Sequence, residues 1–565
     1  MNFIGLLKEK IINTIKETFG VGDLGLKHLD LSLNIDKEES YGDLSCNAAM
    51  ILAKTLGKNP KEIAEKLKKS LICDDYLKTY IKSIDIAGPG FINLHLNSNV
   101  WQKICSELLL KKNECFKTRE DTGDGEKKYL IEFVSANPTG PLHLGHGRGG
   151  IIGDVLANVI SFLGKDVTRE FYINDAGNQI LKLGKSLKIR CQQELGQKVE
   201  LPEDSYQGTY LIDIAKHCIE KNGEKVIEKP ESFFVDYAKI HLLNLIKSDL
   251  GDYGIFFNEW FSEKSLHEDG SVKKAIDILI EKKLAYKKDG ALWFKSSEFG
   301  DDKDRVIQKK DGSLTYIAAD IAYHKNKFDR GYKKLIDILG QDHHGYVKRL
   351  KATLNAIGYN QEDLDVILYQ LVSIKKGDVA ARMSKRSGNF ATLREIIDAV
   401  GKDVARFFYL NRKAEAHLEF DLETALKKTD ENPVYYAQYA YVRTNSLLQK
   451  AKEIPELKIF VENLQQGKVE EKTLTLLAVG EIKLLRKILS LGQILKSIKT
   501  TYQTHLLTYY LLEIAKQFHN YYAHNRIIDA KNLEITKCRL MLVSFVRLNF
   551  GLCLDLLGIS KPEKM

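Results

Sequence analysis

Two short segments of the chain carry residue types suited to binding a nucleoside triphosphate. Residues 141–147 read PLHLGHG, follow an apolar run and open a helical pattern. They place His143, His146 and several glycines where a strand turns into a helix, a position whose N–H groups attract phosphate. Far downstream, residues 382–389 read RMSKRSGN, a cationic segment that contains Gly388. Together the two segments predict the halves of a site that uses ATP to transfer an adenylyl group.

Each residue type has a chemical reason to be there. His143 and His146 are three positions apart, so they share one side of a first helical turn and both can donate to phosphate oxygens. Gly145 lacks a β-carbon and lets adenine approach the backbone. Lys385 can neutralise the leaving pyrophosphate. Taken singly, H-x-x-H also fits a metal site or a core pair, and a basic segment fits a solvated face; the ordered pair favours the ATP site.

The two segments resemble the HIGH and KMSKS signatures of class I aminoacyl-tRNA synthetases. Arg382 stands where the second signature usually begins with Lys, and Arg386 precedes Ser387. The rest of the sequence is similar to arginyl-tRNA synthetases of bacterial type over nearly the whole chain. The similar segments are FVSANPTGPLH (133–143), YINDAGNQ (172–179), GDDKDR (300–305), GQDHHGY (340–346) and NPVYYAQY (432–439). The resemblance implies ATP-dependent ligation of L-arginine to tRNA(Arg) through an arginyl-adenylate, with AMP and pyrophosphate as the other products.

The resemblance also implies which residues bind the substrates. Catalysis is expected from His143, His146 and Lys385, and ATP binding from these three with Gly145, His343, Met383 and Ser384. A planar, permanently charged guanidinium needs carboxylates and flat acceptors. The residues implied to hold it are Glu132, Tyr316 and Asp320, while Asn137 and Gln341 are implied to bind the α-amino or carboxylate end of arginine.

Composition describes an ordinary soluble protein of several domains. A chain of 565 residues is too long to fold around a single hydrophobic core. Of its residues, 44% are hydrophobic and 28% charged. The amino-terminal apolar spacing is interrupted by Lys8, Glu9 and Lys10, which argues against a secretory signal. No apolar stretch was recognised as long enough to cross a membrane, so we expect a cytoplasmic protein. The eight cysteines form no C-x-x-C pair, which predicts no zinc site.

The predicted fold class is α/β, built around a split Rossmann-like parallel-sheet catalytic domain. Residues 1–112 read as a small α/β module and residues 113–425 as the catalytic domain, with a helical connective insertion at about 185–290. Residues 426–565 read as an all-α anticodon-binding bundle, with apolar stripes such as Leu484, Ile488, Leu491 and Ile494.

Two regions carry aromatic and polar side chains suited to unpaired RNA bases. In the strand-like run 91–96, alternation places Phe91 and Asn93 on one face, which could stack and read a base or simply be solvated. In the carboxy-terminal region the candidates are Tyr435, Tyr439, Arg443, His519, Tyr522 and Arg526, for which core packing is the alternative. By resemblance, the first region contacts the tRNA elbow and the second the anticodon loop.

The partners that follow are tRNA(Arg), L-arginine and ATP with Mg²⁺, and we expect a monomer that does not bind membranes. The formal charge of +9, from 85 basic and 76 acidic residues, is too small to decide for nucleic acid alone. A class I synthetase for glutamate or cysteine is a related alternative, and an RNA-binding paralogue without activity is a distinct one. Intact His143, His146 and Lys385 argue against the paralogue, because a binding protein needs no pyrophosphate clamp.

Overall fold

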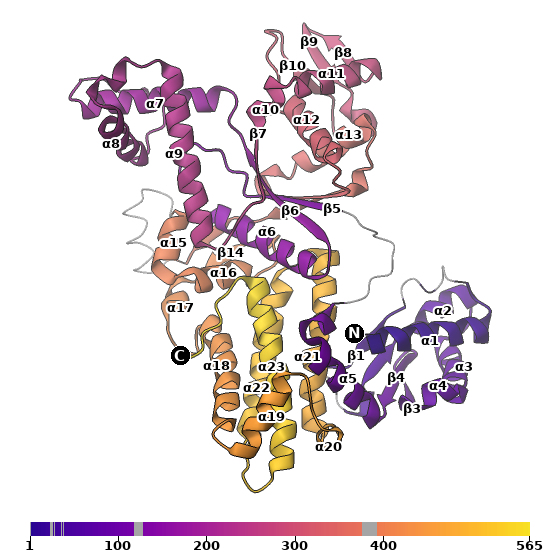
Figure 1. The fold of residues 1–565 in the computed structure, drawn as a ribbon. Coiled ribbons are helices and arrows are strands. Elements are labelled where there is room, and N and C mark those ends of the chain that lie inside the picture. Colours follow the sequence, from indigo (N-terminus) through magenta and orange to yellow (C-terminus); the bar gives the residue numbers. More distant parts are fainter. Residues whose placement is uncertain are drawn as a thin grey trace.

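A parallel sheet of five strands lies at the centre of the molecule (Figure 1). The structure is a computed structural model, which describes residues 2–22, 26, 29–35, 37, 39–117, 128–375 and 392–565. Across the sheet the strands run in the order β12 (Leu364–Tyr369), β11 (Lys334–Gly340), β5 (Lys128–Phe133), β6 (Asp166–Ile173) and β7 (Glu259–Ser262). The order departs from the chain order at β5, and the carboxyl ends of parallel strands around such a point form the usual ligand-binding edge.

The two faces of the central strand β5 are covered in different ways. Helix α6 (Leu144–Phe162) packs closely on one face, where a Cβ added at Gly153 would lie 2.3 Å from the ring of Phe133. Glu132 points to the opposite face, because successive side chains alternate, and there it meets helix α12 (Tyr316–Asp329). One face is therefore apolar and the other is ionic.

Two smaller units are attached to this sheet. Helices α7 (Asn178–Glu194), α8 (Tyr210–Asn222) and α9 (Glu231–Asp252) form a cluster with its own apolar core. The second unit contains α10 (Glu263–Glu268), α11 (Ser271–Glu281), α12, α13 (Tyr346–Ile357) and the antiparallel strands β8 (Ala285–Lys288), β9 (Ala291–Phe294) and β10 (Arg305–Gln308).

This arrangement differs from the mostly helical insertion expected at about 185–290. Strand β7 lies within that range and pairs with β6 in the central sheet, and β8 also falls inside it, paired with β9 just beyond its end. The alternation pattern is weak here because β7 has only four residues and lies directly between helices α9 and α10. Its pairing is fixed by Trp260, whose ring stacks on Phe171 of β6 at 4.5 Å.

The amino-terminal module is a four-stranded antiparallel sheet covered by helices. Its strands are β1 (Leu31–Leu33), β2 (Leu44–Cys46), β4 (Phe91–Leu96) and β3 (Ile81–Ala87), in that spatial order. Its helices are α1 (Asn2–Phe19), α2 (Ala48–Leu56), α3 (Pro60–Cys73), α4 (Asp75–Lys78) and α5 (Ser98–Lys111). In Figure 1 the module lies beside the bundle, where Arg486 of the bundle donates to the carbonyl of Asn34, 3.1 Å away.

The carboxy-terminal region is wholly helical after β14 (Leu418–Phe420), which pairs with β13 (Val372–Ile374). Helices α15 (Leu393–Val400), α16 (Lys402–Leu410) and α17 (Leu422–Leu426) lead into it. The bundle itself contains α18 (Pro433–Ala451), α19 (Pro455–Gln465), α20 (Glu471–Leu474), α21 (Val479–Thr501), α22 (His505–His524) and α23 (Leu533–Leu557). The predicted stripe on α21 is largely correct, since Leu484, Ile488 and Leu491 are buried. These features confirm the predicted fold class.

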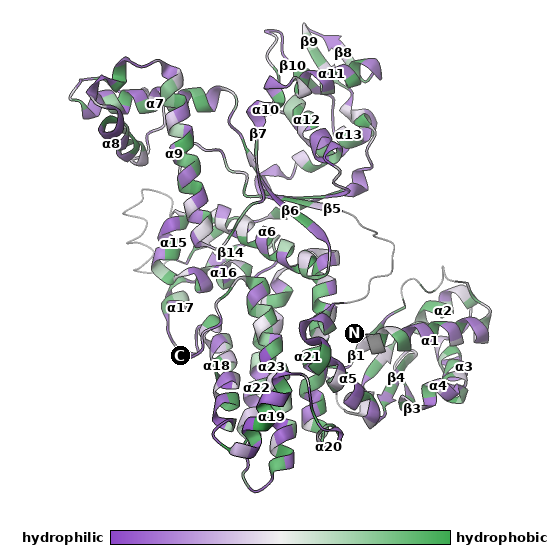
Figure 2. Ribbon diagram, viewed as in Figure 1, coloured by the Kyte–Doolittle hydropathy of each residue, from purple (hydrophilic) through white to green (hydrophobic). Residues whose placement is uncertain are grey.

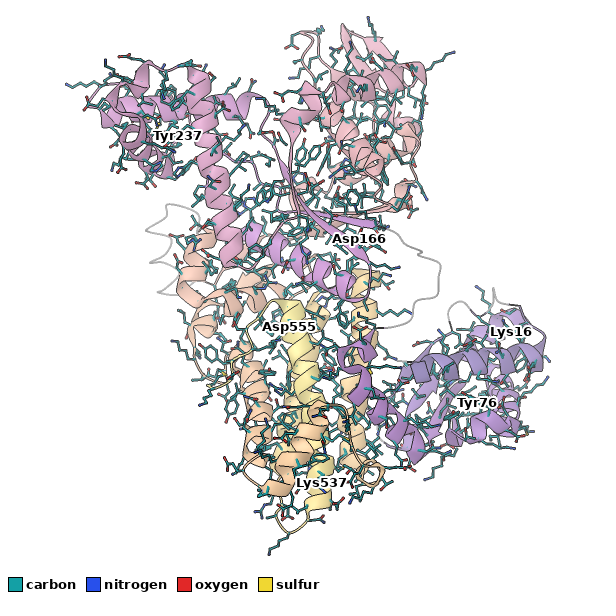
Figure 3. All side chains as sticks on the ribbon, in the orientation of Figure 1. Lys16, Tyr76, Asp166, Tyr237, Lys537 and Asp555 are labelled. Atoms are coloured by element: carbon teal, nitrogen blue, oxygen red, sulfur yellow. The ribbon has the colours of Figure 1, made fainter. Side chains whose placement is uncertain are left out.

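Helix α23 is long and apolar enough to cross a membrane, contrary to the expectation that no stretch of the chain is. Of its apolar window, 72% is buried inside the bundle, so the helix is apolar because other helices surround it. Figure 2 shows mixed hydropathy on the surrounding helices. In Figure 3, Lys537 and Asp555 mark the two ends of α23, one near the far tip of the bundle and one beside the catalytic domain.

A buried arginine joins the end of α23 to the catalytic domain. Arg406 of α16 is fully buried and donates to the carbonyls of Leu557 (2.6 Å) and Tyr253 (2.8 Å) and to Asp154 of α6 (2.5 Å). A Cβ at position 558 would lie 2.4 Å from the guanidinium of Arg406, so only glycine fits at this position. The last helix therefore ends against α6.

The contact between α6 and β5 gives a stability prediction. In Gly153→Ala the new Cβ must displace the Phe133 ring, which should cost about 1–3 kcal/mol and lower the apparent Tm measured by differential scanning fluorimetry. The control is Gly5→Ala in α1, where a Cβ meets nothing within 4 Å; it should leave the Tm unchanged or raise it slightly. A Gly153→Ala protein as stable as the wild type would contradict the tight contact.

Candidate active site

The turn that leaves β5 has an unusual backbone. Val134 and Ser135 have φ values of 67° and 39°, a left-handed conformation that is costly for a β-branched residue. Ser135 pins the turn, because its Oγ donates to Glu132 Oε1 (2.9 Å) and accepts from the N–H of Tyr172 (3.1 Å). Such strain is typical of functional sites, and here it directs the chain from the sheet toward α6.

The two histidines of the first signature form the amino-terminal cap of α6. Nδ1 of His143 accepts the N–H of Gly145 at 3.1 Å, and Nδ1 of His146 accepts the N–H of His143 at 3.3 Å. Their rings stack with centroids 3.6 Å apart. Since each Nδ1 is an acceptor, each neutral ring carries its proton on Nε2. The cap thus fixes both rings with the same tautomer.

Both rings are neutral at physiological pH. Burial lowers the pKa of His143, against the opposing effect of Asp342, and burial together with His143 lowers the pKa of His146 to about 3. The pair therefore offers N–H donors rather than positive charges. Gly145 has a second reason to be glycine, because a Cβ there would lie 2.9 Å from the His143 ring.

Thr392, three positions after the second signature, contacts the first signature. Thr392 forms a β-bridge with His143, and the N–H of Leu393 donates to the carbonyl of Leu142 at 2.8 Å. Leu393 also approaches Gly147, where a Cβ would lie 2.4 Å from its Cδ1. The predicted ATP residues of the second signature, Met383, Ser384 and Lys385, lie outside the described residues.

The predicted arginine-binding residues come from three elements. Glu132 is buried on β5, and its Oε2 lies 2.5 Å from Nζ of Lys327. Tyr316, at the start of α12, is 69% exposed, and Asp320 lies one turn further along the same helix. The carboxylate of Asp320 accepts no hydrogen bond from the part of the chain that the structure describes, so it is available to a ligand.

Asp320 titrates close to neutrality. Burial raises its pKa to about 7, the carboxylates of Glu263 and Glu132 add to this effect, and His324 and Lys327 oppose it. Glu263, at the start of α10, was not predicted; burial raises its own pKa. No sequence motif marks Glu263, because it approaches Asp320 only through the pairing of the short strand β7.

The other candidates lie at the carboxyl ends of β5 and β11. Nδ2 of Asn137 donates to Oε1 of Gln179 at 2.9 Å, which joins the segments 133–143 and 172–179. Gln341 and His343 form the short turn after β11, and the side chain of His343 is half exposed. Among the described residues, no group of three or more His, Cys, Asp or Glu side chains could hold a metal ion.

The tRNA candidates divide into two groups. On α18 and α22, the guanidinium of Arg443 lies 4.6 Å from the ring centroids of both Tyr439 and Tyr522, and its Nη1 is 2.9 Å from Nδ1 of His519. Tyr439 and Tyr522 are exposed. Beside this cluster, Tyr435 is half-buried, and the exposed Arg526 donates to the carbonyl of Ile528.

On β4, the predicted pair is separated by burial. Phe91 is 37% exposed, but Asn93 is only 2% exposed, and its Oδ1 accepts from Oγ of Ser45 at 3.0 Å. The base-reading role expected of Asn93 stays a prediction, although its amide is buried in this conformation. The reason is that β4 is an inner strand with neighbours on both sides, which alternation along one strand cannot reveal.

Comparison with known proteins agrees with this architecture. Residues 105–447 match the family described as "tRNA synthetases class I (R), catalytic domain", residues 437–565 the "DALR anticodon binding domain", and residues 5–96 the "Arginyl tRNA synthetase N terminal domain". The chain belongs to the arginyl-tRNA synthetase family. Family membership makes it an ATP-using class I ligase and confirms the resemblance found in the sequence.

Individual relatives cover the whole chain. It is 42% identical over 544 residues to an arginine–tRNA ligase from Syntrophotalea carbinolica, covering 95% of each chain, and 40% identical over 571 residues to one from Geobacillus kaustophilus, covering 100% of each. Among solved structures, the arginyl-tRNA synthetase of Thermus thermophilus shares the fold with a TM-score of 0.73 and 20% identity, covering 99% of each chain.

The titration of Asp320 predicts a pH dependence. As the pH falls through about 7, Asp320 takes up a proton and loses the charge that a guanidinium requires, so the KM for arginine should rise about tenfold per pH unit in that range. In Asp320→Asn the KM for arginine should be high at every pH, with the KM for ATP nearly unchanged. Equal changes in the KM for arginine and the KM for ATP would show that Asp320 is not part of the arginine site.

Proposed function

We propose that this site performs both steps of arginine ligation to tRNA(Arg). In the first step, a carboxylate oxygen of arginine attacks the α-phosphorus of ATP, the bond to pyrophosphate breaks and arginyl-adenylate forms. In the second step, a ribose hydroxyl of the tRNA attacks the carbonyl carbon of that anhydride and AMP leaves. The observation that carries the proposal is the bridge between His143 and Thr392, because it places the residue three positions after the second signature beside the helix that begins with the first.

In the first step, the histidines act as donors rather than as bases. Negative charge develops on the phosphate oxygens, so oriented N–H groups stabilise the transition state without a nucleophilic side chain. The Nε2–H groups of His143 and His146 are fixed for this by the cap of α6. Around them we assign ATP contacts to Gly145, His343, Met383, Ser384 and Lys385, with Lys385 on the leaving pyrophosphate.

Arginine recognition is assigned to the ionic face of the sheet. Asp320 and Glu132 supply carboxylates for the guanidinium and Tyr316 a flat phenol, while Asn137 and Gln341 bind the α-amino or carboxylate end. The free carboxylate of Asp320 supports this assignment, since a half-buried acid with a raised pKa is stabilised in its charged form by a permanent cation. ATP enters as its Mg²⁺ complex, held by phosphate and water, and no zinc is required.

For tRNA, we propose that the cluster of Tyr439, Arg443, Tyr522 and His519 contacts the anticodon loop, together with Tyr435 and Arg526. Exposed tyrosines around a guanidinium can exchange their contact with that guanidinium for stacking on unpaired bases. Phe91 is retained as a contact to the tRNA elbow. The enzyme is proposed to act as a cytoplasmic monomer without membrane attachment.

The function is tested by arginine-dependent exchange of pyrophosphate into ATP, measured with and without tRNA. Wild-type protein should exchange with arginine and not with lysine or glutamate when tRNA is present. His143→Asn retains a side chain that caps helices but lacks the Nε2 donor, and it should lower kcat about 10²- to 10³-fold with little change in Tm. Failure of the wild type to exchange in the presence of tRNA would favour the RNA-binding paralogue.

The arginine cluster of the bundle gives a second test. Arg443→Met should weaken tRNA(Arg) binding about tenfold, the scale of losing one stacked or charged contact to a base, when measured by filter binding at fixed salt. The matched control is Lys450→Met on the exposed surface of the same helix, which removes the same charge. Equal weakening in both variants would mean that only the overall charge of α18 matters.

A further inference from the structure

Three carboxylates form a row across the buried face of the central sheet. Glu132 on β5 is the register partner of Glu170 on β6 and of Asp337 on β11. They are 7%, 0% and 2% exposed respectively. Neighbouring strands are about 4.8 Å apart, so three ionised acids at this spacing would repel one another strongly unless cations lie between them.

The cations come from α12 and the residue after it. Lys327, which is fully buried, lies between two of the acids, with Nζ 2.5 Å from Glu132 Oε2 and 2.9 Å from Asp337 Oδ1. Arg330 donates to both oxygens of Glu170, at 2.5 Å and 3.0 Å. Lys327 also lies 4.3 Å from the ring centroid of Tyr323.

His324 completes the set. Its Nε2 is 2.9 Å from Asp337 Oδ2, and its Nδ1 is 2.9 Å from the carbonyl oxygen of Asp320. Both partners are acceptors, because Lys327 and His324 together outweigh burial and hold the pKa of Asp337 well below its usual range. Both ring nitrogens therefore face acceptor oxygens. Three acids on the strands are matched by three basic side chains.

This layer of paired acids and basic side chains lies directly behind the proposed arginine site. Glu132 belongs to both: Lys327 holds its Oε2 and Ser135 holds its Oε1. Asp320 lies one turn before His324 on α12. The charged and titratable groups around Asp320 are His324 and Lys327 on its own helix, Glu132 on β5, Glu263 on α10 and Tyr172 on β6.

We propose that Lys327 is a positioning residue of the arginine site, which fixes the Glu132 carboxylate and balances the strand acids so that Asp320 faces a single substrate cation. The inference rests on the proposed function and deepens it. Lys327 does not touch the substrate in this scheme. It sets the charge of the layer, and the guanidinium supplies the one cation that the fold leaves out.

The scheme predicts how the charge of the layer acts on the site. Removing Lys327 leaves one uncompensated negative charge behind Asp320. That charge favours the protonated form of Asp320 and frees Glu132 to move. Removing one acid at the same time restores the net charge of the wild-type layer, whereas removing the acid alone makes the layer more positive than in the wild type. The direction of the effect on Asp320 is thus set by the sign of the imbalance.

The experiment compares Lys327→Met, Asp337→Asn and the double variant by the pH profile of kcat/KM for arginine, with tRNA present. In Lys327→Met the acid limb should move up by about one pH unit and the KM for arginine should rise about tenfold, while the KM for ATP stays within about twofold of wild type. In the double variant both values should return toward wild type. In Asp337→Asn the limb should move to lower pH.

The control is Lys325→Met on the same helix, whose ammonium pairs with Asp329 at the surface; its profile should match the wild type. If Lys327→Met does not fold, the downward shift in Asp337→Asn still tests the scheme. An acid limb that does not move in any foldable variant, or a double variant no better than Lys327→Met, would overturn the proposal. Loss of arginine-dependent exchange in the wild type would instead refute the proposed function.

Discussion

Acids buried on adjacent strands oblige the fold to supply cations at the same depth. Glu170, Glu132 and Asp337 cannot stay ionised beneath a helix unless that helix carries matching charges. This requirement places Lys327 and His324 on the inner face of α12. Because α12 is held at a fixed height and rotation by these pairs, Tyr316 and Asp320 are presented at the ligand-binding edge of the sheet. The opposite face of β5 carries no buried acids and therefore needs no cations. It packs on α6 through contacts such as Gly153 against the ring of Phe133.

Much of the site could be predicted from the sequence, because its motifs are local. The histidines of 141–147 lie where the strand-to-helix pattern placed them, and the bundle follows its apolar stripes. What could not be predicted depends on strand register. Glu132 and Asp337 are 205 positions apart and become neighbours only when β5 and β11 pair. Lys327 reads as an ordinary helix cation until that register is known. Asn93 shows the reverse case, since one strand's alternation does not tell which strands flank it.

The two histidines show how one feature can serve both structure and chemistry. A helix that begins with free N–H groups needs a cap, and a phosphate site needs donors with a defined direction. Using Nδ1 of each ring for the cap leaves Nε2 of each ring for the ligand. Burial of the two rings lowers the pKa of each and keeps both neutral, which avoids a charge that would vary over the physiological pH range.

The packing of α6 depends on parts of the chain that are synthesised long after it. Asp154 and Asn158 of α6 are synthesised early, but two of their partners, Arg406 and the carbonyl of Leu556, lie 252 and 398 positions later in the sequence. Early in synthesis Asp154 has Arg169 as an ion-pair partner, and its buried pair with Arg406 can form only after α16 has been made. The active-site helix therefore reaches its final packing late in synthesis, when α16 and α23 dock against it.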